Sequence, residues 1–118
     1  MRFHSNIEHP KDGWMRFRFA SDAGEIDIIA SYTPNDPLYE FVTAVQAVFE
    51  HGNAHDVRLN EEPQISILTV EKSGERLVLS LKDEDGSLRA CVEGDFQRAC
   101  REIARNLYHL EREVGYDG

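Results

Sequence analysis

The chain between Asp36 and Gly52 reads DPLYEFVTAVQAVFEHG. Asp36 can accept hydrogen bonds from the first free amides of a helix, and Pro37 has the backbone angle of a first helical residue. Gly52 suits the left-handed conformation that ends many helices. Apolar side chains recur at spacings of three and four, at Leu38, Phe41, Val42, Val45, Val48 and Phe49. The pattern predicts a helix from Pro37 to His51 with one buried face.

Two strands are predicted before this helix. Residues 14–20 alternate, with Met15, Phe17 and Phe19 on one side of the strand. Residues 25–32 alternate in the same way, and residues 21–24 between them read Ser-Asp-Ala-Gly, a turn composition. We therefore expect a hairpin.

Four more strands and a helix are predicted after Gly52. The strands are expected at residues 56–60, 64–71, 76–82 and 87–92, with turns between them. Asp95 is expected to cap the last helix, and Gly115 to end it. Its apolar stripe comprises Phe96, Ala99, Cys100, Ile103, Leu107, Leu110 and Val114. The order predicts a single α+β domain over residues 1–118, with one antiparallel or mixed sheet of about six strands and both helices on one face.

Charge is the feature that bears most on function. The 118 residues carry a formal net charge of −9, and no Lys or Arg occurs between Phe19 and Val57. Such a balance disfavours nucleic acid and anionic membranes as partners and favours a basic protein. The sequence contains no apolar run of membrane-spanning length, and its start lacks the apolar core of a secretory signal, so we expect a cytoplasmic protein.

No pattern of catalytic or metal-binding residues is recognised. His51 and His55 are separated by Gly52, so they do not share a helical face and a solvent-exposed loop is favoured over a metal site. Cys91 and Cys100 could meet in space but carry no local signature, and buried thiols are favoured. We therefore expect no metal, no cofactor and no enzymatic activity. A small enzyme, or a regulatory subunit with a pocket between sheet and helix, remains an alternative.

The polar face of the last helix mixes charges of both signs. Three arginines, Arg98, Arg101 and Arg105, lie at helical spacing. The acids interleaved with them are Asp95, Glu102, Glu111 and Glu113. The arginines could form a basic strip, but a solvated face whose charges pair with one another is favoured.

Three short segments of the chain carry a resemblance to known proteins. They are residues 30–45, ASYTPNDPLYEFVTAV, then Phe49-Glu50-His51-Gly52, and finally Glu61-Glu62-Pro63. These segments resemble a pattern in small bacterial proteins, and similar small acidic proteins serve as immunity proteins against polymorphic or contact-dependent inhibition toxins. The resemblance covers roughly residues 14–82. The chain departs from the pattern at Leu59-Asn60, where an aromatic residue often precedes the acidic turn.

The resemblance implies a protein that neutralises a basic, nuclease-like toxin domain through acidic side chains. The partner-binding residues expected are Asp36, Tyr39, Glu40, Glu50, Glu61 and Glu62, with Glu40 and Glu50 near one helix face. Tyr39 would be an aromatic anchor, although packing inside the protein is an equal alternative, and the acidity could serve solubility alone. A homodimer formed through Trp14, Leu68, Val70 and Val78 on an uncovered sheet face is a further alternative.

Overall fold

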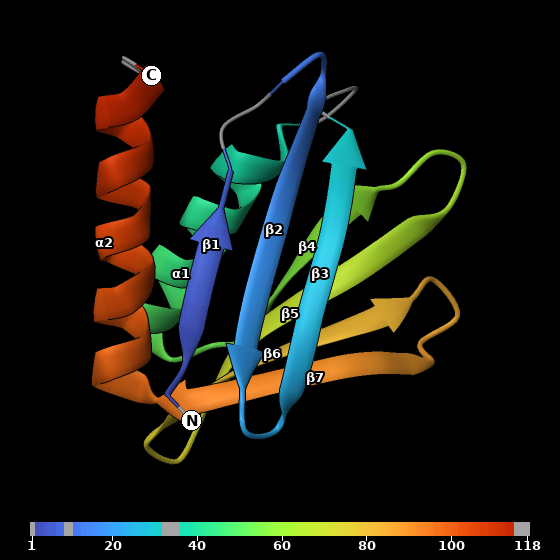
Figure 1. Cartoon of the computed structure of the whole chain (residues 1–118). Helices are drawn as coiled ribbons and strands as arrows, with labels where there is room; N and C mark the ends of the chain where they lie inside the picture. Colours follow the sequence, from blue (N-terminus) through green and yellow to red (C-terminus); the bar gives the residue numbers. More distant parts are fainter. Residues whose placement is uncertain (1, 9–10, 32–35, 115–118) are drawn as a thin grey trace.

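The computed structural model describes residues 2–8, 11–31 and 36–114, and the side chains of these except 111–114 (Figure 1). In this part of the chain two helices and seven strands form. They are β1 (His4–Ile7), β2 (Trp14–Ser21), β3 (Gly24–Ser31), α1 (Pro37–His51), β4 (His55–Asn60), β5 (Ile65–Ser73), β6 (Arg76–Asp83), β7 (Leu88–Asp95) and α2 (Phe96–Val114). Neither helix within these ranges is long and apolar enough to cross a membrane.

The strands form two sheets, so the α+β class is confirmed but the single sheet is wrong. One sheet has the order β1-β2-β3 and the other β4-β5-β6-β7, and every pairing is antiparallel. Figure 1 shows the three-stranded sheet in front of the four-stranded one, with the strands of the two sheets crossing. The sequence pattern does not predict β1, because its residues, HSNI, include only one that is buried in the core.

Each sheet turns one face toward a shared core. Phe17, Phe19 and Ile26 come from the three-stranded sheet, and Leu68 and Leu79 from the four-stranded one; all five are at most 1% exposed. The homodimer surface predicted from Leu68 and Val70 is wrong, since both side chains are completely buried. Val78 does lie on the outer face of its sheet, because its register partners there are Glu71 and Glu93.

Helix α1 has the predicted bounds and caps. The Asp36 carboxylate accepts hydrogen bonds from the amides of Leu38 (3.0 Å) and Tyr39 (3.1 Å). Gly52, at φ 75°, donates its amide to the Val48 carbonyl at 2.8 Å. The buried face of α1 packs on β4 and β5.

Helix α2 closes the edge of the three-stranded sheet and also packs on β6 and β7, in the sheet whose β4 and β5 carry α1. Glu102 Oε2 accepts the Ser5 amide (2.9 Å) and the Ser5 hydroxyl, and Asn106 Oδ1 accepts the Ile7 amide (2.8 Å). Residues four apart in a helix rise about 6 Å, close to the roughly 6.6 Å between residues two apart in a strand, so the spacings match. Asp95 caps α2 as predicted, through the Arg98 amide at 3.1 Å. The predicted stop at Gly115 lies outside the described residues.

Two glycines allow the β2–β3 turn and the start of the chain to pack closely against β7. A Cβ atom on Gly24 would be 2.6 Å from the Cys91 carbonyl oxygen, and one on Gly94 would be 2.7 Å from the Phe3 Cβ. Beside the first contact, Ser21 Oγ accepts the Glu93 amide at 3.0 Å. The β2–β3 turn and the start of the chain are thereby fixed against the carboxyl end of β7.

Candidate functional site: an acidic surface

The β4–β5 and β6–β7 turns lie together at one end of the four-stranded sheet, because alternate turns of an antiparallel meander share an end. Gln64 Nε2 donates to Asp83 Oδ1 at 3.3 Å. Arg89 joins the two turns, since its guanidinium lies 3.1 Å from Glu61 Oε2 and 3.5 Å from Asp83 Oδ1. The turns therefore form one continuous surface.

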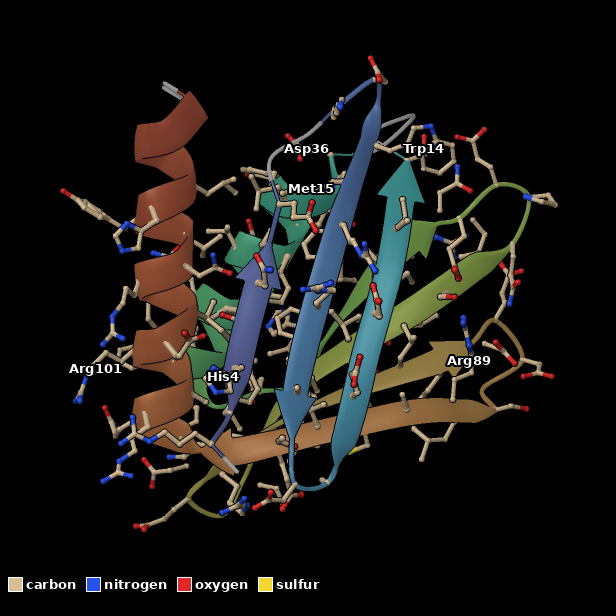
Figure 2. All side chains as sticks on the ribbon, in the orientation of Figure 1. His4, Trp14, Met15, Asp36, Arg89 and Arg101 are labelled. Carbon is tan, nitrogen blue, oxygen red and sulfur yellow. The ribbon has the colours of Figure 1, made fainter. Side chains whose placement is uncertain are left out.

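The amino end of α1 extends this surface. Arg58 on β4 lies 3.5 Å from Glu84 Oε2 and also acts electrostatically on Glu40. We define the acidic surface as Asp36, Glu40, Glu61, Glu62, Asp83, Glu84 and Asp85. These seven acids are accompanied by three bases, Arg58, Lys82 and Arg89, so the surface has a net charge of −4. Figure 2 labels Asp36 and Arg89 near its two limits.

The structure brings together four of the five predicted acids and separates the fifth. Glu50 lies ten residues beyond Glu40 on α1, about 15 Å along the axis. Glu50 belongs to an exposed stripe with Tyr39, while Glu40 is turned away from that stripe and is partly buried. The expectation that Glu40 and Glu50 share a face is therefore wrong. Tyr39 is 68% exposed beside Asp36, so the alternative that it packs inside the protein is also wrong.

The carboxylates of the surface differ in how much of their hydrogen-bonding capacity is used. Glu61 accepts the Ser66 hydroxyl and pairs with Arg89, so it holds the turns together. Asp85 accepts the Ser87 amide at 2.9 Å, and hydrogen bonds to Ser87 lower the pKa of Asp85. Glu62 is exposed to solvent, and Glu84 is also exposed although it lies 3.5 Å from Arg58. These two are therefore accessible negative groups for a partner.

The surroundings of Glu40 disfavour its ionised form. Partial burial raises its pKa first, the neighbouring Asp36 raises it further, and Arg58 offsets part of the effect. Burial and like charge both disfavour the ionised carboxylate. A cation brought close to Glu40 would relieve this unfavourable interaction.

The raised pKa of Glu40 predicts a pH dependence of stability. Just above the ordinary glutamate range, the folded protein holds the Glu40 proton more tightly than the unfolded chain, so stability falls as pH rises through this window. We expect Glu40→Gln to gain stability relative to the parent between pH 4 and pH 7. Urea unfolding across this range measures the gain, with Glu50→Gln as a control at the far end of α1. A Glu40→Gln difference that does not change with pH would contradict this interpretation.

The other chemically reactive side chains do not converge. In the parts of the chain that are described, no three His, Cys, Asp or Glu residues are grouped to hold a metal ion. Cys91 lies on the outer face of the four-stranded sheet, 3.9 Å from the Ser80 hydroxyl, while Cys100 lies on the buried face of α2, where burial raises its pKa. The two thiols therefore do not meet.

Two hollows open beside α2. One, of about 470 Å³, is an apolar groove between α1 and α2, lined by Val45, Phe49 and Leu107 among others. Phe49 is 54% exposed at its rim and stacks on Phe96 with ring centroids 5.9 Å apart. The other hollow, of about 1000 Å³, lies between α2 and β7 and is rich in arginine, including the three arginines that the sequence places at helical spacing.

Comparison of the chain with family models, with curated proteins and with solved structures finds no match. The resemblance to immunity proteins therefore rests on the sequence segments alone. Residues 32–35, which belong to the first of those segments, lie outside the described residues.

Proposed function

We propose that the protein is a cytoplasmic binding protein that neutralises a basic protein partner, a nuclease-type toxin domain, through its acidic surface. The observation that carries the proposal is the grouping of seven acids against three bases on one surface, with the exposed Tyr39 beside it. The partner's cationic site would be covered, and no chemical step by this chain is needed.

The acidic surface suits fast capture of a cationic partner. Complementary charge can raise encounter rates by about 10 to 1000-fold, and salt suppresses this gain. Tyr39 supplies a rigid aromatic group at the edge of the charged area, the type of side chain that most often dominates binding energy. A complex of ordinary size would bury about 1600 Å² in total.

The acids are presented on a fixed backbone. Arg89 links the two turns through Glu61 and Asp83, and Asp36 is held by the first amides of α1. A surface that is already ordered loses less conformational entropy on binding. The internal ion pairs thus serve the proposed function by fixing where Glu62 and Glu84 lie.

The first experiment identifies the partner. The tagged chain is co-expressed with the product of the neighbouring gene, and co-purification of a basic protein or of its C-terminal domain is expected. Failure to bind any basic protein, from this gene pair or from a lysate of the native host, would reject the proposed function.

The second experiment tests the surface. We expect Glu62→Lys with Glu84→Lys to slow association with the captured protein by about tenfold or more at 50 mM NaCl, measured by biolayer interferometry. The matched control is Glu50→Lys with Glu75→Lys, which changes the net charge equally outside the acidic surface. Equal slowing in both double variants would show that total charge, rather than this surface, controls association.

A further inference from the structure

The second hollow lies at the opposite end of β7 from the acidic surface. It is bounded by the first turns of α2, the start of the chain, the β2–β3 turn and the carboxyl end of β7. Five of the ten arginines of the chain line it, and no lysine does. They are Arg2, Arg76, Arg98, Arg101 and Arg105. Figure 2 labels Arg101 at the lower part of α2, far from Arg89 at the other end of the sheet.

Three of the four carboxylates that line the hollow have identified partners. Glu102 accepts the amide and hydroxyl of Ser5, and Asp95 accepts the Arg98 amide as a helix cap. Glu93 pairs with Arg76 at 2.9 Å. Of the interleaved acids, Asp95 and Glu102 thus bind backbone or hydroxyl groups rather than the guanidinium groups of α2. The side chains of Glu111 and Glu113 lie outside the described residues.

Within the described residues, four of the arginines have no acidic partner. No carboxylate oxygen of these residues lies within 4.0 Å of a guanidinium nitrogen of Arg2, Arg98, Arg101 or Arg105. Arg101 and Arg105 are four residues apart on one helix, a spacing at which like charges repel. The lining carries five arginines and four acids, so a chain of net charge −9 is locally positive here.

The walls of the hollow are rigidly placed. Gly94 lets Phe3 lie against β7, which positions the adjacent Arg2, and Gly24 lets the β2–β3 turn lie against Cys91. Arg98, Arg101 and Arg105 project from one side of α2, because their spacings of three and four residues return to the same helical face. Cations from two distant parts of the chain therefore converge on one concave surface.

We propose that this hollow binds a small phosphate-bearing anion through Arg2, Arg98, Arg101 and Arg105. The guanidinium group presents paired N–H donors that match phosphate oxygens, and several such groups around one concavity suit a multiply charged tetrahedral anion. The volume, about 1000 Å³, admits a small-molecule ligand. This site is independent of the proposed function, because the eight residues of β7 separate it from the acidic surface by roughly 23 Å.

Isothermal titration with sodium pyrophosphate at 150 mM NaCl tests the proposal. We expect saturable binding by the parent chain and an at least tenfold weaker affinity in Arg98→Gln with Arg101→Gln, because each charge-assisted hydrogen bond contributes about 1.5–3 kcal/mol. The matched control is Lys11→Gln with Arg18→Gln, two exposed bases outside the hollow, and it should bind as the parent does. Thermal unfolding without ligand checks that all chains are folded.

Three outcomes would overturn the proposal: no saturable heat at millimolar pyrophosphate, equal weakening in the control variant, or citrate binding as tightly as pyrophosphate. The acidic-surface variant Glu62→Lys with Glu84→Lys should keep the pyrophosphate affinity. Loss of affinity in that variant would also count against a separate site. Failure of the toxin-binding experiment leaves this result unaffected, since the two sites use different residues.

Discussion

Replacing Phe41 with alanine is expected to lower the free energy of unfolding by about 3–5 kcal/mol. Phe41 is completely buried on α1, and its ring lies 5.7 Å from that of Phe17 and 5.5 Å from that of Phe19. The substitution would remove the contact that joins α1 to the three-stranded sheet. Because β2 is the central strand of that sheet, the cavity would be enclosed by strand residues that cannot easily move inward.

Urea unfolding measures this loss, and Phe49→Ala is the matched control. Phe49 lies on the same helix but is half exposed, so its removal is expected to cost about 1 kcal/mol, mainly from its stacking on Phe96. An equal decrease in the free energy of unfolding for the two substitutions would show that Phe41 does not occupy the core position described.

Replacing Gly24 with alanine is expected to destabilise the protein by about 1–3 kcal/mol, the range for an added group in a packed region. The new methyl group would lie 2.6 Å from the Cys91 carbonyl oxygen, which belongs to the backbone and cannot rotate away. The β2–β3 turn would have to move off β7. The hydrogen bond from the Glu93 amide to Ser21 Oγ should then be lost.

Hydrogen exchange at the Glu93 amide provides the direct measurement. We expect faster exchange at this amide in Gly24→Ala, with a matched control in Gly74→Ala. Gly74 also has positive φ, 59°, but open space around its Cβ position, so its substitution strains the backbone without moving the turn. Unchanged protection of Glu93 in Gly24→Ala would exclude the close contact.

The parts of the fold that can be predicted from the sequence depend on local signals. Asp36, Pro37 and Gly52 act on amides and backbone angles within a few residues, so the bounds of α1 follow without knowing what surrounds the helix. The hairpin of β2 and β3 follows in the same way from alternation and a short turn. Alternation does not indicate how many sheets a set of strands will form.

The features that the sequence pattern does not predict depend on contacts between residues far apart in the chain. β1 is too short and polar to predict, and its amides are satisfied by Glu102 and Asn106, which lie more than 95 residues away in sequence. The acidic surface can be predicted in part, because the acids are visible in the sequence. Its joining residue, Arg89, pairs with Glu61 across 28 positions and could not be inferred.

The arginine-lined hollow illustrates why charge counting along a helix can mislead. Glu102 counts as a partner of its neighbouring arginines in the sequence because helical residues four apart are adjacent. In the structure its carboxylate turns to Ser5 on β1, where an unpaired strand amide needs an acceptor more than an exposed arginine does. The sequence does contain one indication of the hollow, since the Lys and Arg positions of this helix are all arginine.

The acidic surface and the arginine-lined hollow lie at opposite ends of β7, and the difference in charge between them contributes an electric dipole along that strand. In the field of a cationic body such a dipole experiences a torque as well as an attraction. The end that carries Glu62 and Glu84 would rotate to the front before any contact is made, and the hollow would remain on the trailing side. Rotational alignment would then add to collision frequency, and added salt would abolish both over the same range of concentration.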